Sequence, residues 1–149
     1  MNLKLEKTKL SKYSISNDQG KEIYSLEKKS SLFGSTVYIY DENKLQLAEL
    51  KENIMSKTKY KIYINGSEFD SVTVSQKTPL DKYQLSNKKW TIAGDITYTD
   101  YKVLNEKEEE QMTMKCNLVD PNIWDINITT NETTLAIALA MTILSIAKK

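Results

Sequence analysis

The last stretch of the chain, TLAIALAMTILSIAKK at positions 134–149, is its most apolar segment, in a sequence that is otherwise polar. A helix over residues 135–147 would be hydrophobic on every side, and such a helix in a soluble protein is enclosed all round. It would be about 20 Å long. A bilayer core is about 30 Å thick and needs ~20 apolar residues. We therefore expect a buried core helix at about residues 132–147, with a membrane anchor as the alternative.

The residues just before this segment contain signals for the start of a helix. In the run TTNETT at 129–134, Thr129 or Thr130 can act as the N-cap. Glu132 follows Thr129 by three positions, as in a capping box. The sequence therefore predicts a helix that begins just after these threonines.

Upstream of the helix, apolar residues recur with a period of two rather than 3.6. The run KYKIYI at 59–64 places Tyr60, Ile62 and Ile64 on one face of a strand and lysines on the other. The same alternation recurs in Val72 and Val74, in Trp90 and Ile92, in Met112 and Met114, and in Trp124, Ile126 and Ile128. Turn signals separate these runs, and the strongest is Asn65-Gly66, which tolerates the positive φ angles of a type I′ turn. About nine to twelve short strands at this spacing predict a meandering sandwich or barrel.

Two segments of the chain align without a gap when the sequence is shifted by 64 positions. Residues 37–64 then match residues 101–128, with turn-forming residues on turn-forming residues and alternating runs on alternating runs. Asp41 of one hairpin aligns with Asn105 of the other. The identical pairs are Glu42 and Glu106, Lys51 and Lys115, Asn53 and Asn117, Ile62 and Ile126, and Ile64 and Ile128. This internal repeat predicts two similar β halves.

A closed wall of strands around the C-terminal helix satisfies both hydrophobic patterns. Closure removes the exposed edges of a sheet, and the helix supplies apolar filling for a lumen that side chains alone cannot fill. We therefore expect a mainly β fold in a single domain over residues 1–149, with antiparallel strands at about 3–129 around one buried hydrophobic helix.

The ionisable residues argue against several classes of function. The chain has 21 basic and 20 acidic residues, every basic residue is a lysine, and there is no histidine. Without histidine, the usual proton-transfer group near neutral pH is missing. Without arginine, there is no planar guanidinium group to bind phosphate or guanine through two hydrogen bonds. The lone Cys116 has no disulfide partner and no histidine to activate it, so a reducing compartment is the simpler assumption. We expect no enzyme, no cofactor, no metal site and no nucleic-acid binding.

Lysines concentrate at two places that could bind an anion. Lys57, Lys59 and Lys61 alternate along one predicted strand and should all project from its outer face. Lys88 and Lys89 lie in a predicted turn. A patch of such lysines suits a phosphorylated headgroup or an acidic partner. The alternative is that these lysines only keep the protein soluble and protect strand edges from pairing.

The strand pattern and the terminal helix together resemble a known family. The hairpin VYIYDENKLQLAELK, its counterpart YKVLNEKEEEQMTMK, the segment KWTIAGD at 89–95 and the apolar C-terminus are similar to those of a bacterial member of the tubby C-terminal-like superfamily. The resemblance is closest to the LURP-one-related proteins and extends to the phospholipid scramblases. It implies a barrel of about twelve strands threaded by the C-terminal helix. Tubby proteins bind phosphoinositides and scramblases are linked to lipid movement and calcium, but no calcium-ligand loop of the scramblase kind is present here.

These features predict a cytoplasmic, non-enzymatic binding or regulatory barrel. The N-terminal residues MNLKLEKTKL contain no apolar stretch typical of a signal peptide. The expected partner is an anionic lipid headgroup, another anion or a protein, bound through the lysines at 57, 59, 61, 88 and 89. The alternative is a scramblase-like protein at the membrane periphery, with the C-terminal helix as its anchor.

Overall fold

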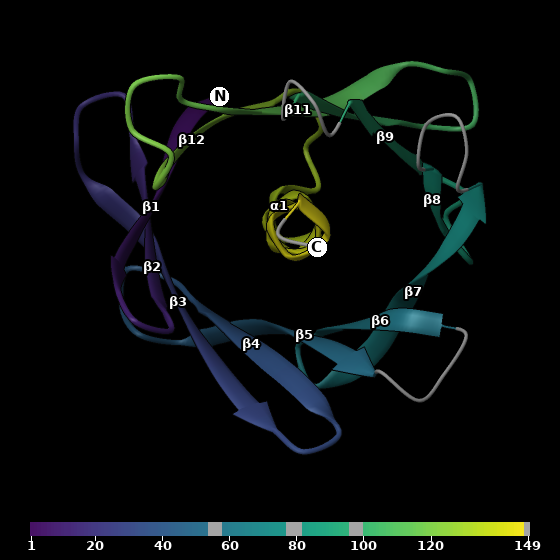
Figure 1. Ribbon diagram of the computed structural model, residues 1–149, viewed down its shortest axis with the longest axis horizontal. Helices are drawn as coiled ribbons and strands as arrows, with labels where there is room; N and C mark the ends of the chain where they lie inside the picture. Colours follow the sequence, from purple (N-terminus) through teal and green to yellow (C-terminus); the bar gives the residue numbers. More distant parts are fainter. Residues whose placement is uncertain (54–57, 77–81, 96–99, 148–149) are drawn as a thin grey trace.

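The computed structural model describes residues 1–53, 58–76, 82–95 and 100–147, and these residues form a closed barrel of twelve antiparallel strands around one helix (Figure 1). The strands are β1 (Asn2–Lys9), β2 (Lys12–Asn17), β3 (Glu22–Ser31), β4 (Gly34–Tyr40), β5 (Gln46–Asn53), β6 (Thr58–Ile64), β7 (Ser67–Gln76), β8 (Lys82–Leu85), β9 (Thr91–Asp95), β10 (Asp100–Leu104), β11 (Glu110–Cys116) and β12 (Ile123–Ile128). Each strand pairs with the next along the chain, and β12 pairs with β1. The barrel alternative of the sequence prediction is thereby confirmed.

The helix α1 (Thr133–Ala147) passes through the lumen, where Figure 1 shows it end-on at the centre of the ring. Residues 135–144 and Ile146 are all buried, so the helix is enclosed on every side as its apolar pattern predicts. Within the described residues, no helix is long and apolar enough to cross a bilayer. Because the strands surround α1, the structure gives no support to its use as an anchor.

The start of α1 differs from the expected capping box. Thr130 accepts a hydrogen bond at Oγ1 from the N–H of Glu132, at 3.2 Å. The Glu132 carbonyl accepts the first helical bond, from the N–H of Ala136 at 3.1 Å, so Glu132 occupies the N-cap position. Thr129 is not the cap, because its hydroxyl donates to the Glu110 carbonyl of β11 at 2.8 Å. The Thr129 hydroxyl therefore bonds to a neighbouring strand rather than to the first turn of its own helix.

Near its other end, α1 is tied to the wall by a polar cluster. Tyr60 of β6 donates from its hydroxyl to Ser145 Oγ at 3.2 Å, and Ser145 donates to Glu52 Oε2 of β5 at 3.3 Å. Ser35 of β4 donates to the same carboxylate oxygen at 3.5 Å. Because three strands contribute to this cluster, it fixes the depth of the helix in the barrel.

The internal repeat is visible in the hairpin turns. Asp41 Oδ1 accepts the N–H groups of Asn43 and Leu45, and Asn105 Oδ1 accepts those of Lys107 and Glu109. The two turns thus have the same hydrogen bonds, and both have a residue with positive φ at the same place, Lys44 and Glu108. The side-chain oxygen of an Asx residue stabilises such a turn by replacing a backbone acceptor. The β4–β6 and β10–β12 units therefore correspond, as the alignment predicts.

The alternation in sequence sets which side chains face the helix. Tyr60 and Ile62 are buried inside the barrel, and Lys61 between them lies on the outer face. The methionines and tryptophans of the predicted strands are likewise buried inside the barrel. The side chain of Val74 lies outside the described residues. Since α1 fills the lumen, polar side chains that could bind a ligand lie mainly on the outer face of the wall.

Candidate functional site

Two of the five lysines predicted to bind an anion fall wholly or partly outside the described residues. Lys57 lies outside them, and Lys59 belongs to β6 but its side chain is not among those described. Lys61 is on the outer face of β6, where its side chain is 44% exposed and its Nζ lies 3.9 Å from Glu68 Oε1. The predicted anion-binding role of the first two therefore stays a prediction.

The two lysines of the β8–β9 turn differ from each other. Lys88 forms an ion pair with Glu132 at the start of α1, and its Nζ lies 4.9 Å from the centre of the Trp90 ring. Lys88 therefore holds the turn against the helix, a structural role that engages its ammonium group. Lys89 is exposed and adopts a φ of 61°. Its role in binding likewise stays a prediction.

Lys61 has a neighbour that the sequence analysis did not single out. In the β5–β6 register it lies directly opposite Lys51, and Lys51 lies opposite Thr36 of β4. These residues line a hollow of about 320 Å³ on the outer face, here called the lysine hollow. Its lining residues are Ser31, Phe33, Gly34, Ser35, Thr36, Lys51, Glu52, Lys61 and Tyr63.

The ammonium groups of the lysine hollow are only loosely paired with carboxylates. Lys51 Nζ lies 3.7 Å from Glu49 Oε2, and Lys61 Nζ lies 3.9 Å from Glu68 Oε1. Both separations exceed hydrogen-bond length, so both ammonium groups can still donate to a ligand. Lys51 also lies 4.7 Å from the centre of the Tyr63 ring, a cation–π contact that orients it. Like charges directly opposite one another destabilise a sheet, and an anion bound between them would remove that repulsion.

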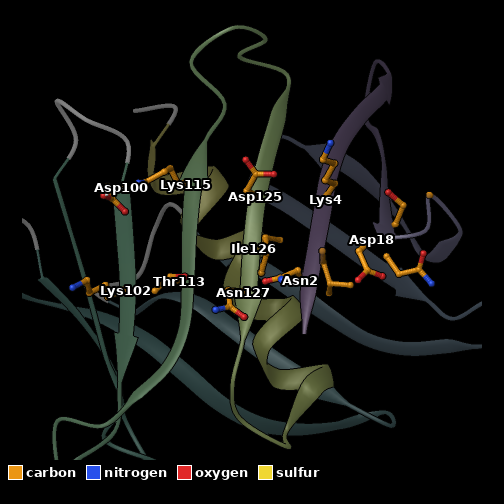
Figure 2. A pocket seen from close by; sticks show the side chains of 14 residues that line it. Asn2, Lys4, Asp18, Asp100, Lys102, Thr113, Lys115, Asp125, Ile126 and Asn127 are labelled. Carbon is orange, nitrogen blue, oxygen red and sulfur yellow. Dashed lines mark ion pairs between the residues drawn. The ribbon is translucent and has the colours of Figure 1, made fainter.

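A larger hollow, of about 660 Å³, lies across β2, β1, β12, β11 and β10, here called the lateral groove (Figure 2). One row of its side chains alternates in charge from strand to strand. Lys4 lies opposite Asp125, Asp125 opposite Lys115, and Lys115 opposite Asp100. Lys115 Nζ and Asp100 Oδ2 are 3.9 Å apart, and Figure 2 shows these two side chains close together. Each lysine of this row therefore has a carboxylate beside it.

The second row of the lateral groove is mostly uncharged. Asn2 lies opposite Asn127, Asn127 opposite Thr113, and Thr113 opposite Lys102. Figure 2 shows the side chains of Asn2 and Asn127 next to each other on these two neighbouring strands. Amide and hydroxyl groups donate and accept hydrogen bonds, so this row suits a neutral or zwitterionic polar ligand. A strongly anionic ligand is disfavoured by the neighbouring aspartates.

Two comparisons find known proteins similar to this chain, and a third finds none. A family model described as LURP-one-related matches residues 1–145. Among solved structures, an X-ray structure of a protein from Arabidopsis thaliana superposes with a TM-score of 0.71. The two are 10% identical, and the match covers 97% of this chain and 90% of the plant chain, so this likeness shows the fold alone. No curated protein matches the chain.

Proposed function

The chain belongs to the LURP-one-related family, and on that premise we propose that it is a non-enzymatic, intracellular binding protein that recognises a phosphorylated anion at the lysine hollow. The ligand chemistry is a phosphate ester, carried either by a lipid headgroup or by a soluble metabolite. The observation that carries the proposal is the cross-strand pair of Lys51 and Lys61.

The geometry of this pair suits a phosphate group. Neighbouring strands lie about 4.8 Å apart, so one phosphate can accept hydrogen bonds from both lysines at once. A phosphate monoester carries a charge of about −1.5 to −2 at pH 7, which would neutralise both ammonium groups. Thr36, opposite Lys51 on the neighbouring strand, can add a hydroxyl donor. The predicted contributions of Lys57, Lys59, Lys89 and Lys88, whose ammonium group is paired with Glu132, are tested by substituting each of them in the same assay.

A binding role is favoured over catalysis by the inventory of side chains. The chain has no histidine, and its single cysteine is half-buried beside backbone carbonyls of Asn117 and Pro121. In the described part of the chain, no three Asp, Glu or Cys side chains gather as metal ligands. Apart from Glu52, which accepts hydrogen bonds from Ser35 and Ser145, the lysine hollow supplies ammonium and hydroxyl groups, which bind an anion but provide no general base near neutral pH.

The proposal is tested with two probes that separate the possible sources of the phosphate. Glycerol 3-phosphate represents the soluble ester, and vesicles of phosphatidylcholine with phosphatidic acid represent the headgroup. We expect the double substitution Lys51→Gln and Lys61→Gln to weaken binding of whichever probe the protein binds by at least about tenfold, since each near-surface lysine contributes ~1 kcal/mol toward an anionic surface.

The matched control is Lys102→Gln with Lys115→Gln in the lateral groove. It removes the same charge from the same outer face of the barrel. An equal loss in both double variants would mean that binding follows net charge rather than a site. Failure of the unmodified protein to bind either probe at low ionic strength would refute the proposal.

A further inference from the structure

Five large apolar side chains at hairpin tips are almost fully exposed. Leu10 joins β1 to β2, Leu32 and Phe33 join β3 to β4, and Leu118 and Val119 lie between β11 and β12. Their exposed fractions are between 73% and 96%. Turns normally carry Gly, Asn, Asp, Ser or Pro, so leucine, phenylalanine and valine at three tips are not explained by turn chemistry. We call these five residues the apolar rim.

The barrel topology brings the apolar rim to one end of the molecule. In an up-and-down barrel, successive connections alternate between the two ends, so β1–β2, β3–β4 and β11–β12 all close at the same end. Because β12 pairs with β1, the three tips follow one another around this end, and Figure 1 shows these strands side by side in the wall. The tips therefore form one arc on one surface, although they are far apart in sequence.

Charge is distributed unequally between the two ends. Lysines lie behind two of the three apolar tips, with Lys9 and Lys12 flanking Leu10, and Lys28 and Lys29 preceding Leu32, whereas Asp120 follows the third tip. At the opposite end, the described connections and the strand residues that follow them carry more carboxylates than lysines. The carboxylates include Asp18, Glu22, Asp41, Glu42, Glu68, Glu106, Glu108 and Glu109, and the lysines are Lys21, Lys44, Lys88, Lys89 and Lys107. A negatively charged plane would therefore attract the end that bears the apolar rim and repel the other.

We propose that the apolar rim inserts into the interface of an anionic lipid bilayer while the lysines behind it contact the headgroups. A bilayer interface presents negative headgroups above an apolar layer, and the rim presents apolar points below a row of lysines. This order of layers is what favours a bilayer over a protein partner. The inference rests on the proposed function only in taking the membrane to be negatively charged. It adds which end of the protein faces the membrane. The lysine hollow, which includes Phe33, then opens beside the surface.

The test uses a rim variant outside the lysine hollow, Leu118→Ser with Val119→Ser, and a control at the opposite end, Leu45→Ser. Leu45 is itself an exposed leucine, in the β4–β5 connection. Binding is measured by co-sedimentation with vesicles of phosphatidylcholine, with and without phosphatidic acid. We expect the rim variant to lose at least about tenfold in binding to the anionic vesicles, because the removed side chains carry apolar surface into the membrane. The control should bind like the unmodified protein.

Insertion is distinguished from surface adsorption by quenching of tryptophan fluorescence with brominated acyl chains. A tryptophan in Leu118→Trp should be quenched on binding, and one in Leu45→Trp should not. The inference is overturned if the rim variant binds vesicles normally, if the protein does not bind vesicles, or if the rim substitutions change only self-association in size-exclusion chromatography. Binding of glycerol 3-phosphate separates the two proposals, because the rim variant should retain it. Rim-dependent vesicle binding that does not depend on Lys51 and Lys61, together with no binding of glycerol 3-phosphate, would refute the proposed function and leave this inference standing.

Discussion

The enclosed position of α1 makes a quantitative prediction for the substitution Leu139→Ala. Leu139 lies in the middle of the helix, and its side chain is fully buried. Replacing its isobutyl group with a methyl group loses about 2–3 kcal/mol of transfer free energy. A further loss follows from the cavity, because the strands around the helix are tied to one another and cannot close over it. We expect the free energy of unfolding to fall by about 3–5 kcal/mol.

The measurement is urea unfolding followed by tryptophan fluorescence. Trp90 and Trp124 are both in the core, so their emission reports on the same packing. Leu45→Ala is the matched control, since Leu45 is 64% exposed and its removal should change stability by less than about 0.5 kcal/mol. If Leu139→Ala cost as little as the control, the helix would not be the core of the folded protein in solution.

Further substitutions test three separate features of the fold by thermal unfolding. Gly94→Ala places a Cβ about 2.1 Å from Cδ1 of the buried Tyr101 ring and should destabilise by about 1–3 kcal/mol; an unchanged melting temperature would contradict that contact. Asp70→Ala removes a buried carboxylate that accepts three backbone N–H groups, and it should cost about 3–5 kcal/mol, clearly more than Asp70→Asn. Lys88→Met and Glu132→Gln should each lower the free energy of unfolding by ~1 kcal/mol, and the double variant should lower it by little more than either one. Additive losses of stability would show that the two residues do not act as a pair.

The strand faces and the central helix could be predicted because their signals are local. One buried face imposes a period of two on a strand, and the run KYKIYI therefore fixes the inward position of Tyr60 and Ile62 without knowledge of their neighbours. The helix could be predicted because it is apolar all round and too short to span a bilayer. The paired turns at Asp41 and Asn105 follow from the same side-chain chemistry at two repeat positions.

The candidate sites could not be predicted because they depend on register and on closure. Lys51 and Lys61 belong to strands joined by residues 54–57, which contain no turn signal that would fix which residues lie opposite one another. The lateral groove needs β1 and β12, from the two ends of the β region, to pair. The predicted capping box at Thr129 was wrong for a related reason, because the hydroxyl of Thr129 forms its hydrogen bond with β11 instead. Contacts between distant segments leave little trace in a single sequence.

The cross-strand lysines allow stability and binding to be separated in one experiment. If the pair is retained for anion binding, then without ligand its repulsion lowers stability, and Lys61→Gln should stabilise the protein by roughly 0.2–1 kcal/mol at low ionic strength. Added glycerol 3-phosphate should raise the melting temperature of the unmodified protein, because a ligand that binds only the folded state stabilises it. The same addition should have much less effect on Lys61→Gln. A Lys61→Gln variant that is less stable than the unmodified protein and is still stabilised by the ligand would show that Lys61 contributes to the sheet rather than to a phosphate site. A residue retained for binding should lower the stability of the free protein and raise that of the protein with its ligand bound.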